Sequence, residues 1–435
     1  MLGTPPGPPV SIVVPLPPSY RGGTEEYAYR LAGVYARSHP VSVLTTTVRW
    51  RPDAPLLDVG RANVERLPAP EVFERPLLLS PRSRARLWRT IHRTRVLQLH
   101  MPFPLVEAPA VRLARRAGAA TVLTYHMDAD LSGARRVPGS GVVTALYRRL
   151  SAHPALDACD VVVANSWGYA RASPVLSKHL AKVRVIHKGV DRARLGFDRR
   201  AGRSRPRPAS VPSEAVPEGR DRLLFIGRLV PYKGVPVLLD ALHRLLDGGR
   251  DAMLMVAGRG PLDAELRAQA RSMGLADRVA FLGFVPDEEV GPLYRFADVV
   301  VAPSVNTLEA TATALEEAAM CGTPVVGTTL PGTEETVPHD GRGGLLVAPG
   351  DADALARAID RMLEVGRPRA PMPLRTWEDT AREYLGLFDE LGANLPRAAR
   401  PSPFVPRTPK GFRHPSGISA SLGIGSGRSH RRSRT

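Results

Sequence analysis

Short apolar runs rich in β-branched residues alternate with helix-length segments along the first half of the chain. Because strands that alternate with helices pair into parallel sheets, this half is predicted to be a doubly wound α/β domain with helices on both faces. Strands are predicted at 11–14, 41–45, 96–100, 121–125, 161–165 and 184–186, and helices at 25–37, 110–117 and 142–150.

The same alternation restarts at residue 223 and predicts a second domain of the same kind. Ligands bind beyond the carboxyl ends of the strands in such sheets, so two facing domains predict a cleft. Strands are predicted at 223–226, 252–256, 279–282, 299–302, 324–326 and 345–347, and helices at 235–246, 264–273, 288–296, 311–320 and 352–364.

Composition divides the chain into five parts. Residues 1–198 and 223–373 are the two predicted domains, and an Arg/Pro-rich linker or loop at 199–222 joins them. A last helix at 374–391, within the part 374–392, is expected to return to the first domain. Residues 393–435 are rich in Pro, Ser, Gly and Arg, and are predicted to be a disordered basic tail.

The chain has 435 residues, of which 43% are hydrophobic, as in a soluble protein. It contains no apolar run of 18 residues, so no membrane-spanning helix is expected. The first residues lack the basic start and apolar stretch of a signal peptide. Cys159 and Cys321 have apolar neighbours and are predicted to be buried thiols. These features predict a cytoplasmic protein, with peripheral binding to the inner face of the membrane left open.

The formal charge of +18 is concentrated in two segments. Residues 397–435 hold eight Arg, one Lys and no acid, and residues 199–222 hold seven Arg against three acids. The folded body is therefore only mildly basic, and no zinc-finger or RNA-binding signature suggests a specific nucleic-acid partner. Nucleic-acid binding through the tail remains an alternative.

A basic segment at 82–95 has two interpretations of equal weight. It is either a helix that lies on an anionic membrane surface or a surface helix whose apolar residues face the core. The apolar residues in question are Leu87, Trp88 and Ile91.

Two carboxylates, Glu309 and Glu317, stand eight residues apart around the start of the predicted helix at 311–320. If the helix begins near Glu309, they are separated by a rise of about 12 Å. A carboxylate pair that cleaves one glycosidic bond needs about 5 to 10 Å. The spacing suits two carboxylates that bind opposite ends of one long ligand, with an anion of that ligand bound at the helix N-terminus. From the spacing alone, an ordinary helix with charged positions is the favoured interpretation.

Three strand ends carry residues that suit phosphate or sugar binding. Gly22 and Gly23 open the helix after the first strand, and Gly258 lies in a loop of the second domain; glycine permits close approach of backbone to a ligand. Arg228 and Lys233 flank a turn where an anion is expected. Each of these segments is also compatible with an ordinary strand–helix connection or surface charges.

His126 follows the predicted strand at 121–125, at the edge expected to face the cleft, where a lone histidine is more often structural. The sequence contains no Ser-His-Asp order, H-E-x-x-H motif or Cys/His cluster. No metal and no cofactor are therefore expected.

Together, these segments resemble the retaining glycosyltransferases of family 4 over residues 10–392. The resemblance rests on Phe-Ile-Gly-Arg-Leu-Val-Pro-Tyr-Lys-Gly at 225–234, Gly-Arg-Gly-Pro-Leu at 258–262, and two glutamates separated by seven residues. Each piece is weak, but the ordered set is specific. It implies the GT-B fold, in which two Rossmann-like doubly wound α/β domains face each other across a cleft.

The resemblance also implies a nucleoside-diphosphate sugar as donor. Arg228 and Lys233 would neutralise its diphosphate, and Glu317 would bind the ribose. Glu309 would hold the sugar hydroxyls. The other implied donor contacts are Gly22, Gly23, Gly258, Phe284, Val285, Ala310, Thr311 and Ala312.

The implied reaction is transfer of a hexosyl-type sugar to an unidentified acceptor with retained anomeric configuration. The implied catalytic residues are His126, beside the reacting carbon, with Arg228, Lys233 and Glu309. No protein nucleophile and no metal would be needed, because stabilised leaving-group charge and acceptor positioning carry catalysis.

One departure from the family pattern is the Ala310-Thr311-Ala312 segment, where glycine usually follows the first glutamate. Ala310 restricts the backbone conformations that glycine would allow, so an unusual sugar pocket is expected. The departure keeps open a non-catalytic nucleotide-sugar binding protein. A nucleotide-sugar epimerase is a minor alternative.

Overall fold

The computed structural model describes residues 7–18, 23–47, 57–69, 71–72, 75–76, 80–129, 140–192, 194–196, 207–368, 372–373 and 375–392. All of them belong to one unit, Met1–Phe404. The predicted tail at 393–435, the first part of the predicted linker and Gly22 lie outside the described residues.

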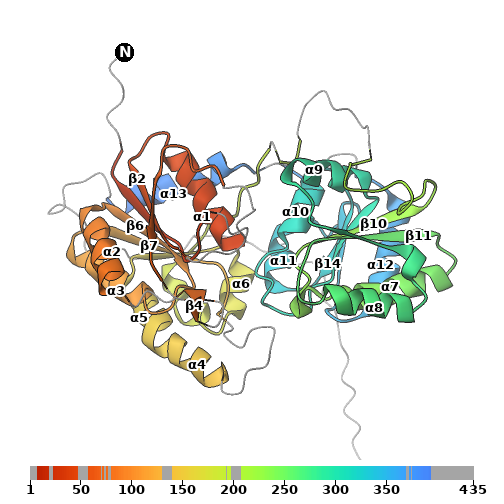
Figure 1. Cartoon of the computed structure of the whole chain (residues 1–435), viewed down its shortest axis with the longest axis horizontal. Coiled ribbons are helices and arrows are strands. Elements are labelled where there is room, and N and C mark those ends of the chain that lie inside the picture. The colour runs from red at the N-terminus through yellow and green to blue at the C-terminus, as the bar shows by residue number, and fades with distance from the viewer. Residues whose placement is uncertain are drawn as a thin grey trace, which may run out of the picture. The chain divides into compact units, whose positions relative to one another are not determined.

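The first sheet has seven parallel strands in the order β3-β2-β1-β6-β7-β8-β9 (Figure 1). Successive residues of a strand point to opposite faces of the sheet, so each face has its own hydrophobic core under its own helices. Ile12 belongs to the core under α1, whereas Val13 belongs to the core under α3. The strands are β1 Val10–Val13, β2 Val41–Thr46, β3 Asn63–Leu67, β6 Val96–Met101, β7 Ala120–Tyr125, β8 Val161–Ala164 and β9 Val183–Val185.

The helices of this half are α1 Gly23–Tyr35, α2 Pro81–Arg93, α3 Glu107–Arg116, α4 Ser140–Tyr147, α5 His153–Ala158 and α6 Trp167–Ala172. A π-helical turn, Arg148–Ala152, joins α4 to α5, and β4 Glu71–Val72 pairs antiparallel with β5 Arg75–Pro76. Short 3-10 turns at Leu176–Lys178 and Leu180–Lys182 precede β9. The sequence pattern missed β3, the short strands β4 and β5, and the helices α5 and α6.

The second sheet has six parallel strands in the order β12-β11-β10-β13-β14-β15. The first strand of this half lies in the middle, which is the doubly wound arrangement expected from the sequence. The strands are β10 Asp221–Ile226, β11 Ala252–Ala257, β12 Val279–Gly283, β13 Val299–Ala302, β14 Val325–Thr328 and β15 Gly344–Val347.

Helices cover both faces of the second sheet, with α7, α8 and α12 over one core and α9 and α10 over the other. They are α7 Val235–Asp247, α8 Asp263–Ser272, α9 Asp287–Phe296, α10 Thr313–Met320, α11 Pro331–Thr336 and α12 Ala352–Val365. Two 3-10 turns, Pro231–Lys233 and Ala276–Arg278, complete this half. Two parallel-sheet α/β domains were predicted, and both are present.

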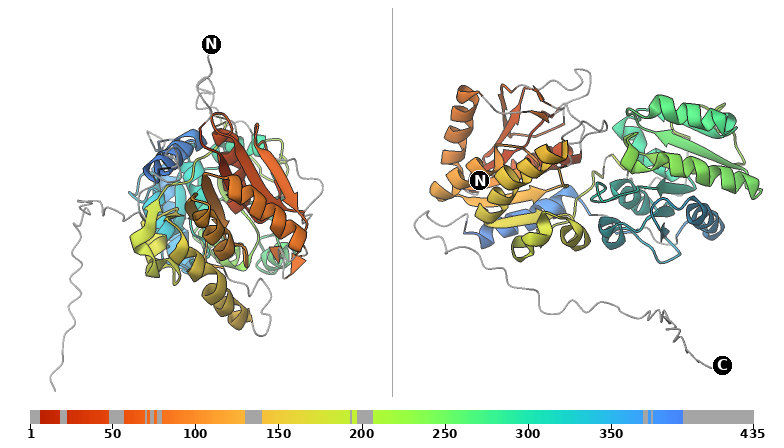
Figure 2. Two further views of the ribbon diagram at one scale, coloured as in Figure 1. Left: turned by 90° about the vertical axis from the view of Figure 1, so that its left-hand side faces the viewer. Right: turned by 90° about the horizontal axis from the view of Figure 1, so that it is seen from below.

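The last helix, α13 Trp377–Glu390, packs against α1 of the first domain. Its blue ribbon lies with the red and orange half of the molecule in Figure 2. Tyr27 of α1 and Tyr384 of α13 share a hydrogen bond of 3.2 Å between their hydroxyls. A capping box of Thr376 and Asp379 begins the helix. Val190 pairs with Thr376 as a parallel bridge, so the outgoing and returning segments of the chain run side by side.

Two further expectations are decided by burial. Leu87 and Ile91 of α2 are 1% and 0% exposed, and Trp88 packs on the same core, so the apolar side of this basic helix faces inward. The described end of the predicted linker is part of the second domain, because Val211 and Val216 are buried in its core.

Both cysteines are free thiols, and burial raises the pKa of each to about 12. Cys159 is buried, as predicted, whereas Cys321 is partly exposed. None of the helices in the described part of the chain has both the length and the apolar character that crossing a bilayer requires.

Candidate functional site

Lys233 and Glu309 meet at the carboxyl ends of two neighbouring strands, β10 and β13. Lys233 closes the 3-10 turn after β10, and Glu309 lies in the loop after β13. The Lys233 Nζ donates a hydrogen bond to the Glu309 Oε2, which also accepts one of 2.8 Å from the Ser304 hydroxyl. Gly234, at φ +68°, lets the two loops touch, because a Cβ there would lie 1.9 Å from the Pro303 carbonyl oxygen.

The pair is charged and shielded from water. The Glu309 residue is 7% exposed. Burial alone would lower the pKa of Lys233, but the adjacent carboxylate outweighs burial and raises it. Lys233 has three N–H groups, and Glu309 has a second carboxylate oxygen, Oε1, with no hydrogen-bond partner among the described residues. The cluster therefore retains hydrogen-bonding capacity for a polar ligand.

Glu317 lies on α10 and uses both carboxylate oxygens. Oε1 accepts a 2.7 Å hydrogen bond from Arg194, and Oε2 accepts a 2.8 Å hydrogen bond from the Tyr294 hydroxyl. Arg194 also lies within 3.9 Å of Glu26 and 3.4 Å of Asp287. Burial opposes the charge of Arg194, yet these carboxylates raise its pKa further above the usual range. The Arg194 partner of Glu317 was missed by the sequence, because it lies 123 residues away along the chain.

The two glutamates do not share a helix. The helix α10 begins at Thr313, close to the predicted start at 311, so Glu309 lies in the preceding loop and the condition for a helical rise of about 12 Å is not met. The Ala310 and Ala312 residues are buried, and Ala312 has φ −84°. No residue at 310–312 has positive φ. A loop without such a residue has no conformational need for glycine.

The glycine-rich loops pack on each other. Gly258, at φ +135°, approaches Gly227 so closely that a Cβ would lie 1.8 Å from the Gly227 carbonyl oxygen. This contact requires glycine at position 258, and the donor contact predicted for Gly258 stays a prediction. Arg228, which follows Gly227, is exposed and has no ion-pair partner among the described residues.

Gly23 begins α1, and a Cβ at Gly23 would meet nothing within 4 Å, so this end of the helix is open.

Two predicted base contacts differ in exposure. The Phe284 side chain is 51% exposed, whereas Val285 is 7% exposed and belongs to a core of the second domain. Phe284 is therefore available to stack on a planar group. Val285 instead supports the loop.

His126 forms a buried pair with His100, which the sequence did not reveal. His100 Nδ1 and His126 Nε2 are 2.8 Å apart, and the rings stack with an angle of 17° between their planes. Tyr27 contacts both rings edge-on. Burial lowers the pKa of both histidines, that of His126 to about 3, with a further contribution from Lys188 to His126. Both are neutral at pH 7, so one nitrogen of the pair donates and the other accepts.

The tautomer follows from the second nitrogen of His100. His100 Nε2 is buried without a hydrogen-bond partner. Buried N–H groups are seldom left unpaired, whereas a bare acceptor nitrogen is less costly. His100 therefore donates through Nδ1 to His126 Nε2. His126 is left with its proton on Nδ1.

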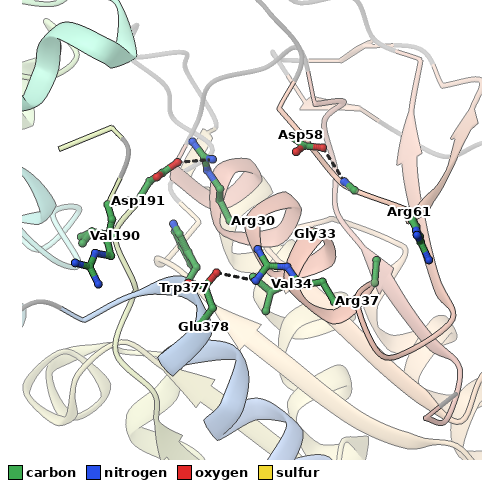
Figure 3. Close-up of a pocket in the computed structure, with 13 residues that line it drawn as sticks. Arg30, Gly33, Val34, Arg37, Asp58, Arg61, Val190, Asp191, Trp377 and Glu378 are labelled. Carbon is green, nitrogen blue, oxygen red and sulfur yellow. Dashed lines mark hydrogen bonds and ion pairs between the residues drawn. The ribbon is translucent and has the colours of Figure 1, made fainter. Parts of the chain in front are cut away.

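A cavity of about 720 Å³ contains none of these residues (Figure 3). It lies between α1, the loop before β3 and the start of α13. Two of its four arginines are paired with acids: Arg30 with Asp191 at 2.7 Å, and Arg37 with Glu378 at 2.9 Å. Size alone therefore does not locate the predicted site. In the described ranges, no three His, Cys, Asp or Glu residues are arranged to hold a metal ion.

Two protein-family models match the chain, one over each half. The model for Glycosyltransferase Family 4 matches residues 21–194, and the model for Glycosyl transferases group 1 matches residues 206–374. Together they cover most of the described residues.

Curated relatives match over a shorter span. The D-rhamnosyltransferase WbpZ of Pseudomonas aeruginosa is 33% identical over 266 residues, which is 61% of this chain and 63% of WbpZ. The O-antigen chain mannosyltransferase C of Escherichia coli is 28% identical over 61% of this chain and 65% of its own length. The chain thus spans slightly under two thirds of the length of these relatives.

The fold is shared with HepE from Anabaena, solved in complex with UDP-glucose. The TM-score is 0.58 and the identity 21%, and the match covers 90% of this chain and 98% of HepE. At this identity the likeness concerns the fold. The matching models, relatives and fold agree: the chain belongs to the group 1, family 4 type of glycosyltransferases with the GT-B fold.

Proposed function

We propose that the protein transfers a hexosyl-type group from a nucleoside-diphosphate sugar to an acceptor hydroxyl, with retention and without a metal. The observation that carries the proposal is the buried Lys233–Glu309–Ser304 cluster at the carboxyl ends of β10 and β13. HepE, whose fold is similar, is solved with UDP-glucose, which favours this class of donor.

In the proposed reaction, the bond between the anomeric carbon and the diphosphate oxygen breaks as the acceptor oxygen bonds to the same carbon from the same face. The acceptor proton passes to the departing diphosphate. The two N–H groups of Lys233 that Glu309 does not use, with the free Arg228 guanidinium, stabilise the charge on that leaving group. Glu309 Oε1 accepts a hydrogen bond from a sugar hydroxyl. Glu317, whose two oxygens already accept from Arg194 and Tyr294, uses a remaining lone pair to accept a further one from the ribose.

The donor is identified by thermal shift with UDP-, GDP- and ADP-sugars, since a ligand bound only by the folded state raises the melting temperature. Turnover of the best donor is then followed by release of the nucleoside diphosphate, and proton NMR of the product gives the anomeric configuration. Activity that survives EDTA supports a reaction without a metal. Binding without any turnover would instead establish a nucleotide-sugar binding protein.

The acceptor side includes a possible contact with an anionic membrane through α2. Its exposed arginines are Arg82, Arg84, Arg86, Arg89 and Arg93. Because the apolar residues of α2 face the core, the proposed contact is electrostatic and weakens with salt. Flotation with phosphatidylserine vesicles at low and moderate salt tests it. Absence of binding at low salt would exclude the contact.

A further inference from the structure

A second, smaller cavity of about 180 Å³ lies apart from the Lys233–Glu309 cluster. Its wall is formed by residues after β8 and β9, the end of the loop before α10, α10 itself, α11 and the returning segment before α13. It has room for roughly six waters at their liquid volume, and therefore for a group much larger than one water. Its polar lining consists of Asn165, His187, Lys188, Thr311, Glu316, Glu335, Thr336 and Arg375.

Three polar atoms from this lining are buried without a hydrogen-bond partner. They are Asn165 Oδ1, His187 Nδ1 and Glu316 Oε1. The Asn165 and Glu316 residues are 7% and 6% exposed, so more than nine tenths of each is buried. Burying an unpaired polar atom is unfavourable, and three of them rarely line one cavity unless something else pairs with them.

We propose that this cavity binds a hydroxyl-rich ring of the reacting substrates, and that Asn165 and Glu316 hold its hydroxyls. A hydroxyl group both donates and accepts, so it can pair with an amide oxygen, an imidazole nitrogen and a carboxyl group alike. A phosphate offers acceptors only when fully ionised and fits the two unpaired oxygens poorly. An apolar group would leave all three atoms unpaired.

The charge of the lining agrees with a neutral ligand. The lining contains two cationic residues, Lys188 and Arg375, and two acidic residues, Glu316 and Glu335. Arg375 already donates a hydrogen bond of 3.1 Å to the His187 carbonyl oxygen. Burial raises the pKa of Glu316 to about 7, with a smaller lowering by Thr336 and Lys188. Near neutral pH this carboxyl group is present in both protonation states. It can therefore donate to a hydroxyl or accept from one.

The place of the cavity connects it with the proposed reaction, on which this inference rests. Glu316 precedes Glu317 on α10, and Thr311 follows the buried Ala310. Lys188, from the same lining, lowers the pKa of His126 and of Glu316, so it lies near both. The ring in the cavity is thus either the transferred sugar or the part of the acceptor that receives it.

Glu316→Leu and Asn165→Leu test the proposal, with Glu316→Gln as the variant that keeps a hydrogen-bonding group. Calorimetry measures dissociation constants for UDP and UDP-glucose, and for D-glucose and myo-inositol in the presence of UDP. If the cavity takes the transferred sugar, both Leu variants weaken UDP-glucose at least tenfold and leave UDP unchanged. If it takes the acceptor ring, UDP and UDP-glucose bind normally, and the free polyols lose binding at least tenfold. In either case Glu316→Gln retains most of the affinity.

Glu265→Leu, the same exchange on the exposed side of α8, is the matched control and should change none of these constants. Melting curves show whether each variant is folded. Unchanged constants for every ligand in both folded Leu variants would mean that the cavity holds water only, and would overturn the proposal. Wild-type protein that binds polyols through Glu316 but none of the UDP-, GDP- and ADP-sugars would refute the proposed function while leaving the binding of a hydroxyl-rich ring in this cavity intact.

Discussion

The two sheets present chemically opposite groups at their carboxyl ends. At the second domain, opposite charges meet: Lys233 with Glu309, and Glu317 with Arg194 from the segment after β9. In the first domain, His100 and His126 are packed against Tyr27 and kept neutral by burial. Under the proposed function, the charged end meets the leaving group. The neutral end places a hydrogen-bonding group that carries no charge.

The largest expected effect concerns the charged end. Lys233→Ala should lower the turnover of the donor by about 100- to 1000-fold, because it removes a preorganised donor from the developing diphosphate charge. Release of nucleoside diphosphate measures this. Lys178→Ala, an exposed lysine of the first domain, is the matched control and should retain full activity.

Lys233→Ala also leaves the buried Glu309 without its cation, which lowers stability. The double variant Lys233→Ala/Glu309→Gln removes that unpaired charge and should regain much of the melting temperature. It should remain inactive. Turnover near the wild-type rate in a folded double variant would contradict the assignment of the charged end.

The neutral end predicts a pH response of its own. Because the pKa of His126 falls from about 6.5 in the unfolded chain to about 3 in the fold, the unfolded state binds more protons below pH 6.5. Stability is therefore complete above pH 6.5 and is lost as the pH falls, by up to about 1.4 kcal/mol per pH unit for each such histidine. Melting temperatures between pH 7 and 4.5 measure it, and His100→Phe/His126→Phe should flatten the decline.

Glu316 predicts a response of opposite sign. Its pKa is raised from 4.5 to about 7, so its proton stabilises the fold below pH 4.5, and this contribution is lost as the pH rises towards 7. The loss is about 3 kcal/mol at most. Glu316→Gln should therefore gain stability over the wild type at pH 8 but not at pH 4.5. Equal differences at both pH values would show that the carboxyl group is not perturbed.

The smallest effect concerns the orientation of His126. His100→Phe removes the hydrogen bond that fixes the His126 proton on Nδ1, and should lower turnover by about tenfold with little change in donor affinity. Nitrogen-15 NMR of the imidazoles distinguishes this from a general loss of packing. The wild type should show the Nδ1–H tautomer of His126, and the variant a mixture. An unchanged tautomer in His100→Phe would contradict the positioning role.

The sequence allowed the architecture to be predicted because both sheets are parallel and covered on both faces, which leaves continuous apolar runs such as those of β11 and β13. The strand β3 was not predicted because it is an edge strand with mostly polar, partly exposed residues. The helices α6 and α11 escaped because six residues are too few to show a helical period.

The candidate site was only partly predictable. Lys233 and Glu309 come together because β10 and β13 are neighbours in the sheet, an order that motifs suggest but spacing does not reveal. His100 was missed because its partner lies on the adjacent strand. Glu316 looked like one more charged helix position, since nothing in the local pattern shows that this carboxyl group is buried.

The close contact behind Ala310 ties two distant positions together. A Cβ at Gly332 would lie 1.8 Å from the Ala310 carbonyl oxygen, so the space beside the Ala310–Ala312 loop depends on the absence of a side chain on α11. In evolutionary terms, the two positions are epistatic. Exchange of the loop for that of a relative would succeed only where residue 332 stays glycine, and a donor-range library built on 310–312 alone would sample a constrained set of shapes.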